Sequence, residues 1–288
     1  MSVAKFDRRL GAGFLATVPL GPGVYRVFDE AGALVYVGKA KSLRRRLSQY
    51  RRATRRKAHR KMLAIVGLAA RIEIETCASE HEARLLEARL IREHRPRANV
   101  DGAFFFLYPF VGLARAEGET RFCYTSHADL AEGYELHGAF RSREVTWSAF
   151  SGLMRLLDHL GHRSRAPRAT AKGLHVVRFR RLDAALVAAW SQFFSGASRD
   201  ALRALSLALV ERAGARASAG EVQEALDALV AFWEHEAQPL LEARRRTGFT
   251  TYPVAQHERD ELFLEARHLA REAARPAGAD DATRDPSP

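Results

Sequence analysis

Four side chains in the first hundred residues carry chemical groups that packing alone does not call for. Tyr25 and Tyr36 lie in two short β-like runs, and Arg46 and Glu87 each interrupt the apolar stripe of a predicted helix. A phenol or a carboxylate can exchange protons, and a guanidinium binds anions through its planar fork. These four residues are therefore the first candidates for a functional site.

Two interpretations of Arg46 and Glu87 are open at this level. A buried charge without a partner is costly, so the two side chains could pair with each other, or each could extend from the edge of its stripe into water. They could instead line a small polar cleft where the two stripes converge on Tyr25 and Tyr36. Spacing along the sequence does not choose between these interpretations.

Local patterns predict the elements that position these residues. Residues 24–28 and 34–37 are β-like runs, and the acidic and glycine residues of 29–32 between them predict a β-hairpin. Ser42 is a candidate N-cap for a helix that runs to about Tyr50. Its inward face, spaced i, i+3, i+4 and i+7, would carry Leu43, Arg46, Leu47 and Tyr50.

A second helix, a third strand and a longer helix complete the predicted domain. The second helix covers about residues 57–66, and the alternation in 71–76 predicts a half-buried strand. Ser79 and Glu82 form a capping box that opens a helix to about His94, which a nearby proline ends. The apolar stripe interrupted by Glu87 consists of Ala83, Leu86, Leu90 and Ile91.

The positive charge of the chain is concentrated near its N-terminus. Residues 1–100 hold 22 Lys and Arg against 9 Asp and Glu, whereas the remainder holds 24 against 25. Residues 39–61 contain 12 basic residues and no acid, a density that favours a polyanion such as a nucleic acid backbone. A solvated basic face or a localisation patch is the alternative. The predicted DNA-binding residues are Lys41, Arg44, Arg45, Arg51, Arg52, Arg55, Arg56, Lys57, Arg60 and Lys61.

The composition of the whole chain excludes several classes of protein. The 288 residues suffice for two domains, each with its own core. No apolar run approaches the roughly 18 residues of a membrane helix, and no signal peptide is recognisable, so we expect a cytoplasmic protein with no membrane partner. Cys77 and Cys123 are the only cysteines, which excludes a disulfide framework and a cysteine-ligated zinc or iron–sulfur site.

The spacing of these polar residues resembles that of the GIY-YIG nuclease family. The matching residues are Gly23-Val24-Tyr25, Tyr36-Val37-Gly38, Arg46, Glu87 and Asn99. Segments 36–46, 85–91 and 95–100 are similar in particular to the N-terminal nuclease domain of the excinuclease UvrC and to that of its stand-alone homologue Cho. The resemblance implies an endonuclease that makes a 3′-side, single-strand incision in damaged double-stranded DNA during nucleotide excision repair.

The expected fold class is α/β (α+β), with a small, mostly antiparallel three-stranded sheet flanked by helices and a mainly helical second domain. We expect an N-terminal lead-in over 1–20, a nuclease domain over 21–100, a mixed then helical UvrC/Cho-like domain over 101–272, and a disordered tail over 273–288. The likeness to UvrC and Cho beyond residue 100 is weaker and includes Leu136–Phe140.

The resemblance also implies a one-metal mechanism. Glu87 would be the ligand of a single divalent ion, Mg²⁺ or Mn²⁺. Tyr36 would be the general base, with Lys39 and the metal lowering the pKa of its phenol, and Tyr25 is the alternative base. Arg46 would clamp the scissile phosphate.

Two further residues receive positioning roles from the same resemblance. Tyr50 and Asn99 would orient the attacking water or the phosphate by hydrogen bonds. The cysteine cluster common in the family's linker region is missing, so no iron–sulfur cluster is expected. The chain ends before a second, RNase H-like nuclease could fit, which favours a single-incision, Cho-like enzyme.

Residues beyond 100 contribute mainly architecture. The aromatic run 103–111 is more typical of a core strand or domain seam than of a base-stacking platform, and the Arg-rich stretch 165–173 is typical of a linker or a basic loop that could touch DNA. Periodic apolar residues predict helices over 182–194, 201–213 and 222–237.

Two other functions are compatible with the sequence. One is a structure-specific GIY-YIG endonuclease outside excision repair, and the other is a DNA- or RNA-binding adaptor that keeps the scaffold without cutting. The sequence leaves open whether a UvrB-like repair helicase recruits the protein, and it leaves open the oligomeric state.

Overall fold

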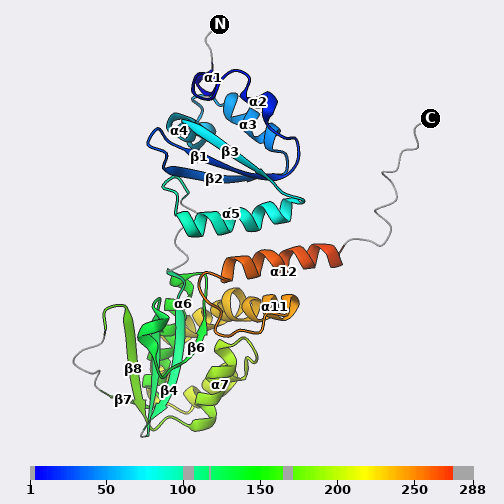
Figure 1. Cartoon of the computed structure of the whole chain (residues 1–288). Helices are drawn as coiled ribbons and strands as arrows, with labels where there is room; N and C mark the ends of the chain where they lie inside the picture. Colours follow the sequence, from blue (N-terminus) through cyan, green and yellow to red (C-terminus); the bar gives the residue numbers. More distant parts are fainter. Residues whose placement is uncertain (1–3, 100–106, 117, 165–170, 275–288) are drawn as a thin grey trace. The chain divides into compact units, whose positions relative to one another are not determined.

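The computed structural model describes residues 4–99, 107–116, 118–164 and 171–274. The chain divides into two compact units, Met1–Phe105 and Phe106–Pro288, each built around its own sheet (Figure 1). Several expectations fall outside the described residues: the first part of the aromatic run 103–111, most of the basic stretch 165–173, and the tail from residue 275 onward.

The sheet of the first unit begins with the predicted hairpin. Strands β1 (Gly23–Phe28), β2 (Leu34–Ala40) and β3 (Arg71–Thr76) are antiparallel, in the order β2-β1-β3. In the turn, Asp29 Oδ1 accepts the backbone N–H groups of residues 31 and 33 at 3.1 and 3.0 Å, and Gly32 takes a positive φ of 78°. The predicted three-stranded antiparallel sheet is therefore confirmed, with β2 at one edge.

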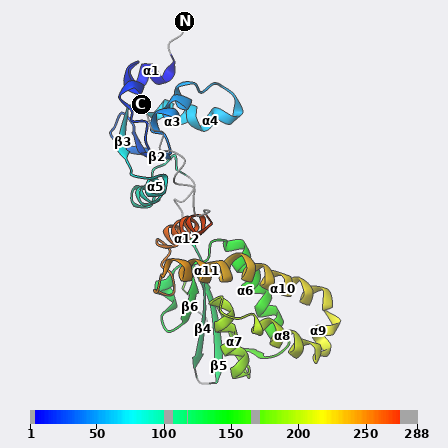
Figure 2. The ribbon, with the colours of Figure 1, turned by 90° about the vertical axis from the view of Figure 1, so that its right-hand side faces the viewer.

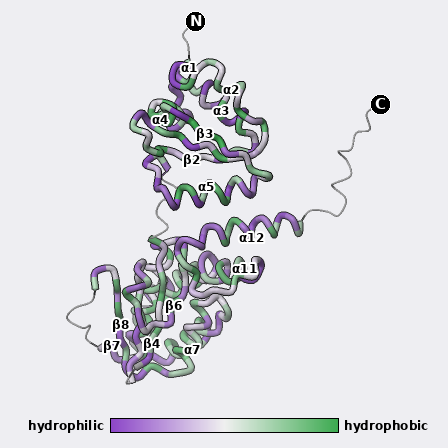
Figure 3. The backbone as a smooth tube through the Cα atoms, viewed as in Figure 1, coloured by the Kyte–Doolittle hydropathy of each residue, from purple (hydrophilic) through white to green (hydrophobic). Residues whose placement is uncertain are grey.

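Helices cover both faces of this sheet. Helix α5 (Glu80–His94) packs on one face through Val24 and Val37, and α3 (Leu43–Arg51) and α4 (Arg60–Leu68) pack on the other. In α5 the hydropathy alternates along the helix, as expected for one buried side (Figure 3).

The N-terminal lead-in belongs to this unit. Residues 5–10 and 14–17 form helices α1 and α2, and Phe6 and Val18 are buried in the core that also holds the hairpin tyrosines. From residue 4 onward, the predicted lead-in thus contributes side chains to the core of the first unit. Its apolar residues have no other surface to bury, so they complete the face of the sheet that α3 and α4 cover.

The two predicted N-caps differ in their chemistry. Ser79 Oγ accepts the Glu82 N–H at 3.0 Å, and Glu82 Oε2 accepts the Ala78 N–H at 2.6 Å, so α5 begins with two satisfied donors. Ser42 occupies the N-cap position of α3, but its side chain makes no capping hydrogen bond. The first N–H groups of α3 are satisfied instead by the carbonyls of Pro19 and Gly21.

The second unit contains a five-stranded antiparallel sheet. Its strands, in the order β6-β4-β5-β8-β7, are β4 (Phe110–Ala116), β5 (Glu119–Thr125), β6 (Glu135–Gly138), β7 (His162–Ser164) and β8 (Leu174–Arg180). The strands lie between residues 110 and 180 and helices follow from residue 184, so the expectation of a mixed and then mainly helical domain is confirmed. Thr120, Phe122 and Tyr124 are strand-forming residues that recur at every second position, which is the signal that identifies β5.

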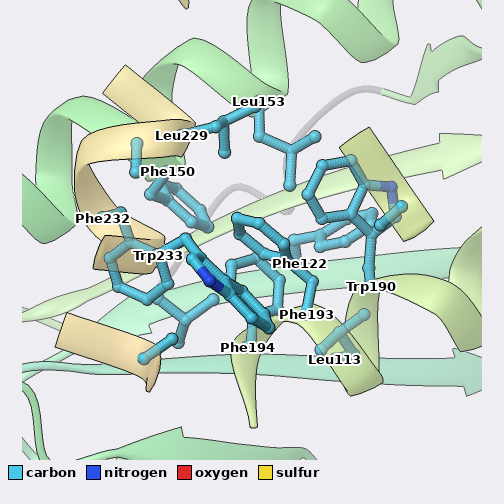
Figure 4. Close-up of a cluster of buried hydrophobic side chains, with 14 of the residues drawn as sticks. Leu113, Phe122, Phe150, Leu153, Trp190, Phe193, Phe194, Leu229, Phe232 and Trp233 are labelled. Atoms are coloured by element: carbon cyan, nitrogen blue, oxygen red, sulfur yellow. The ribbon is translucent and has the colours of Figure 1, made fainter. Parts of the chain in front are cut away.

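The helices of the second unit build one large core against the sheet. The predicted helices are confirmed with shifted ends, because Asp183 caps α7 and a π-helical turn over Trp233–Ala237 extends α10. Large aromatic side chains fill the core, among them Phe122, Trp190 and Phe232 (Figure 4). The helices are α6 (Arg143–Asp158), α7 (Ala184–Phe194), α8 (Asp200–Val210), α9 (Ala213–Ala217), α10 (Ala219–Phe232), α11 (Gln238–Thr247) and α12 (Arg259–Ala273).

Buried polar side chains hold the loop between β6 and α6. Glu236 accepts the N–H groups of Arg141 and Ser142 at 2.6 and 2.9 Å, and Arg259 Nε donates to the Ala139 carbonyl at 3.0 Å. Glu236 and Arg259 are each 4% exposed, and their charged groups lie 3.9 Å apart. This network fixes residues 139–142, which overlap the segment Leu136–Phe140.

None of the described helices is both long and apolar enough to cross a lipid bilayer.

Candidate active site

The two hairpin phenols lie on one face of the first sheet. Tyr25 is opposite Gly38 in the β1–β2 register, and Tyr36 is opposite Val27. The two rings are 6.1 Å apart, and the two residues are 1% and 7% exposed. A Cβ on Gly38 would come within 2.5 Å of the Tyr25 phenol and 2.8 Å of the Tyr36 ring. The glycine of this motif is therefore required because both phenols pass directly over its backbone.

Helix α3 adds a third phenol and a guanidinium to this cluster. The Tyr25 and Tyr50 hydroxyls are 2.9 Å apart, and the Arg46 guanidinium lies 5.5 Å from the centroid of the Tyr50 ring. Arg46 Nη1 donates to Gln49 Oε1 at 3.0 Å, while its buried Nε has no hydrogen-bond partner among the described residues. A buried donor left unpaired in this way favours an anionic ligand at Arg46.

Strand β2 has a free edge, and side chains from distant segments satisfy its backbone there. Asn99 Oδ1 accepts the Val37 N–H and its Nδ2 donates to the Val37 carbonyl, both at 2.8 Å. Two residues along, Glu87 Oε1 accepts the Lys39 N–H at 3.0 Å. Asn99 and Glu87 thus take the place of a fourth strand.

This placement gives Asn99 a structural role in addition to the predicted one. Both polar atoms of its buried amide are bonded to the Val37 backbone, and one N–H and one lone pair remain for the water or phosphate that the family resemblance implies, so that role stays a prediction. Asn99 therefore positions the strand that carries Tyr36.

The ammonium group of Lys39 lies away from the phenols. Its Nζ donates to Glu80 Oε1 at 3.2 Å, and the same oxygen accepts from Arg84 Nη2 at 2.6 Å. The two cations lower the pKa of the Glu80 carboxyl. The expectation that Lys39 acts on the Tyr36 phenol is therefore corrected, because β2 alternates its side chains and Lys39 projects toward α5.

Burial dominates the protonation of both candidate bases. It raises the pKa of Tyr36 to about 12, and the neighbouring Tyr50 acts in the same direction. Burial also raises the pKa of Tyr25 well above its ordinary value, with Tyr50 and Tyr36 acting in the same direction and Arg46 opposing them. The cation that lowers the pKa of Tyr36 is Lys61, whose Nζ lies 5.7 Å from the ring centroid.

Glu87 has the properties of a ligand for a hard cation. Burial raises the pKa of its carboxyl, while the Lys39 N–H and the charges of Lys39, Arg46 and Arg84 act against the rise. In the part of the chain that the structure describes, Oε1 is bonded to Lys39 and Oε2 has no protein partner. No cluster of three or more His, Cys, Asp or Glu residues forms among the described residues. A single carboxylate suits Mg²⁺, which keeps most of its water ligands.

These contacts narrow the two interpretations of Arg46 and Glu87. Over residues 4–99 no ion pair joins the two side chains, and the charge of Arg46 only opposes the rise in the pKa of Glu87. Arg46 lies beside the Tyr50 ring, and Glu87 accepts the Lys39 N–H at the edge of β2. The direct pair is therefore not formed, and the polar cleft remains a prediction.

Two of the predicted DNA-binding cations have other partners. Arg44 donates to the carbonyls of Val18 and Ala16 at 2.7 and 3.2 Å, which ties the N-terminal segment to α3. Arg51 Nε is 2.9 Å from both Asp7 carboxylate oxygens. The remaining predicted cations are exposed, namely Lys41, Arg45, Arg52, Arg55, Arg56, Lys57, Arg60 and Lys61.

Three contributors to the site are not recognisable as such from the sequence. Gly38 stands out only as part of a motif, Glu80 only as a first-turn residue of α5, and Lys61 only as one of the DNA-binding cations. Glu80 and Arg84 are four residues apart on a helix, a spacing that predicts an ion pair. Nothing local places Lys61 over Tyr36.

Comparisons with known proteins match the N-terminal part of the chain. The model of a UvrC-like GIY-YIG domain matches residues 21–100. UvrABC system protein C of Klebsiella pneumoniae (strain 342) is 46% identical over 101 residues, which cover 35% of this chain and 16% of that protein. The protein of the same name from Nitratidesulfovibrio vulgaris is 36% identical over 165 residues, 51% of this chain and 24% of that protein.

The chain therefore spans a quarter or less of the length of these curated relatives. Among solved structures, the GIY-YIG N-terminal endonuclease domain of UvrC from Thermotoga maritima, bound to its catalytic divalent cation magnesium, is 33% identical. The match covers 33% of this chain and 97% of that domain, with a TM-score of 0.28.

Proposed function

We propose that the chain is an endonuclease that hydrolyses a phosphodiester bond in damaged double-stranded DNA, because its residues 21–100 match the model of a UvrC-like GIY-YIG domain. The observation that carries the proposal is the meeting of Tyr25 and Tyr36 over Gly38, with Arg46 beside Tyr50 and Glu87 held at the adjacent edge of β2. Exposed cations near this cluster suit the substrate's phosphates.

The side chains divide the proposed reaction between them. Arg46, with its unpaired Nε, binds the scissile phosphate and stabilises its charge in the transition state. Tyr36 is the more accessible phenol and accepts the proton of the attacking water, while Tyr25 and Tyr50 bond to each other. Tyr25 is the second candidate for the base.

The free oxygen of Glu87 would hold one Mg²⁺ or Mn²⁺ ion, which supplies Lewis-acid stabilisation of the phosphate oxygens. The chain's own contribution is to orient this carboxylate through the Lys39 N–H. Lys39 in turn is held by Glu80, so the ligand and the strand are positioned together.

The finer assignment rests on the family likeness. We propose a single-strand, 3′-side type of incision in nucleotide excision repair, by a Cho-like enzyme that acts with a UvrB-like repair helicase in the cytoplasm. The matched relatives are named for the UvrABC system, and one of the matches extends well beyond the 80 residues of the family model.

A nicking assay tests the proposal. An end-labelled duplex with one bulky lesion is incubated with Mg²⁺ or Mn²⁺ and with the full chain, with or without a UvrB-like partner. We expect one incision 3′ to the lesion, lost in Glu87→Ala and Tyr36→Phe. Glu93→Ala is the matched control, because Glu93 is an exposed carboxylate on the same helix. Undiminished nicking by Glu87→Ala would defeat the assignment.

The same assay separates the two alternatives. Metal-independent binding without any nicking would support an adaptor. Partner-free cleavage of undamaged branched DNA would support a structure-specific nuclease outside excision repair.

A further inference from the structure

The five-stranded sheet of the second unit has two unlike faces. One face packs against the helices through residues such as Phe122, Tyr124 and Phe179, and Figures 1 and 2 show these helices gathered to one side of the sheet. Because side chains alternate along a strand, Arg121 and Arg178 project from the opposite face. In the described part of the unit, neither arginine belongs to the hydrophobic core.

Arg121 and Arg178 form an unusual cross-strand pair. They are direct partners in the β5–β8 register, and like charges placed opposite each other destabilise a sheet. Both side chains are half-buried, and the Nε atoms of both are buried without a hydrogen-bond partner. Neither guanidinium forms an ion pair within the described residues. The fold thus concentrates two uncompensated charges where an anion would relieve both the repulsion and the unpaired donors.

The surroundings of the pair add positive charge. Arg180 lies two residues along β8 on the same face and is exposed. Among the described strand residues of this face on β5, β7 and β8, Glu119 is the single acid. It is opposite Arg180 in the register, and its Oε1 accepts the Ser164 hydroxyl at 2.8 Å. The residues after 100 hold 24 basic and 25 acidic side chains, so this excess is local.

Tyr134 immediately precedes β6 and lies near the pair. A Cβ on Gly112 would come within 3.1 Å of Tyr134 Cβ and 2.6 Å of Cys123 Sγ, so these residues pack tightly against the strand. Burial raises the pKa of the Tyr134 phenol, and the charges of Arg121 and Arg178 act against the rise. The hydroxyl therefore lies within electrostatic range of both guanidinium groups.

We propose that Arg121, Arg178 and Arg180 form an arginine face that binds the phosphate backbone of the DNA substrate, as a second contact surface separate from the cations of α3 and α4. Planar guanidinium forks match phosphate oxygens. Arg178 and Arg180 are about 6.6 Å apart along the strand, roughly the axial rise of two nucleotides. The choice of DNA rests on the proposed function.

Binding measurements test this inference independently of cleavage. The full chain is titrated onto a fluorescein-labelled duplex without divalent metal, and the dissociation constant is followed between about 50 and 200 mM salt. We expect the double variant Arg121→Gln/Arg178→Gln to weaken DNA binding roughly tenfold. The slope of the logarithm of the binding constant against the logarithm of the salt concentration should fall in magnitude by about 1.8, which corresponds to the loss of two phosphate contacts. The Arg121→Lys and Arg178→Lys pair should retain most of the slope.

Arg203→Gln is the matched control, because Arg203 is an exposed arginine on α8 in the same unit. Circular dichroism melting of each variant verifies that it is folded. If the double variant binds with the same affinity and salt slope as Arg203→Gln, the inference is overturned, whether or not the wild type nicks DNA. A change of oligomeric state with DNA binding intact would also overturn it, since the face would then join two copies of the chain.

Discussion

If Tyr36 is the general base, its phenol has to lose a proton in an environment that disfavours the phenolate. Its pKa is raised to about 12 by burial, so only a small fraction is phenolate at neutral pH. Lys61 is the side chain that opposes this rise, from 5.7 Å above the ring. The activity of the site should therefore depend on pH and on the charge at residue 61.

Replacing Lys61 by methionine should shift the pH profile of nicking toward higher pH. A cation near an aromatic face at an exposed site contributes about 0.5–1 kcal/mol, so we expect a shift of roughly half a pH unit. The direction follows because loss of the cation raises the pKa of Tyr36, and the phenolate becomes populated only at higher pH. The measurement is the nicking rate under single-turnover conditions across the alkaline range.

Two controls accompany the Lys61 experiment. Lys61→Arg keeps the charge and should keep the wild-type profile. Arg8→Gln removes an exposed charge of the same unit and should leave the profile in place. A Lys61→Met profile that merely falls in amplitude, with no shift, would point to DNA binding rather than to an effect on Tyr36.

Glu87→Gln should separate activity from stability. The raised pKa of Glu87 means that its ionised form is disfavoured in the fold, so its contribution to stability is greatest below its unfolded pKa and falls as pH rises through its folded pKa. A neutral amide oxygen can still accept the Lys39 N–H. We expect nicking to fall about 100-fold or more, while the unfolding free energy at neutral pH stays equal or rises. Urea unfolding of both proteins provides the check, and a clear destabilisation would refute the argument.

At the scale of elements, the free edge of β2 is the feature that assembles the site. Asn99 and Glu87, which lie far along the chain from β2, satisfy the backbone groups of Val37 and Lys39 there. Asn99 and Glu87 therefore protect the edge strand from pairing with another chain, and they bond to the strand that carries Tyr36.

Asn99→Ala should destabilise the first unit. It removes two hydrogen bonds to Val37, each of which contributes about 0.5–1.5 kcal/mol, so the expected loss is roughly 1–3 kcal/mol. Nicking should also fall, because β2 carries Tyr36. Thermal melting tests this against Arg89→Ala, an exposed substitution on α5. An unchanged melting temperature would show that water replaces the Asn99 amide at no cost.

At the scale of the whole molecule, the two units have separate hydrophobic cores. The core around Phe6 and Tyr25 shares no residue with the core around Phe193 and Phe232. Each core is large enough to support its own cooperative transition, so the units can be perturbed one at a time.

Phe193→Ala should therefore lower the midpoint temperature of one calorimetric transition and leave the midpoint temperature of the other unchanged. Phe193 is completely buried, and truncation of a buried phenylalanine costs about 3–5 kcal/mol. Phe6→Ala should produce the reciprocal result in the first unit. The measurement is scanning calorimetry of the full chain. A single transition that shifts equally in both variants would show that the units unfold together.

Much of the first unit could be predicted from local patterns. The hairpin follows from two β-like runs around an acidic and glycine-containing turn, and α5 follows from Ser79 and Glu82. The positions of Arg46 and Glu87 are visible because a charge inside an apolar stripe breaks a short-range periodicity. These features depend on residues that are close together in the sequence.

The tertiary structure decided which groups meet. Asn99 bonds to Val37 over 62 residues, and Glu87 bonds to Lys39 over 48, and no local pattern encodes either contact. The same holds for the Arg121–Arg178 pair, since its like charges adjoin only when β5 and β8 pair. Sequence periodicity determines which face of an element a residue occupies. Only the packing of distant elements determines what that face contacts, and therefore whether a charge is paired, unpaired or available to a ligand.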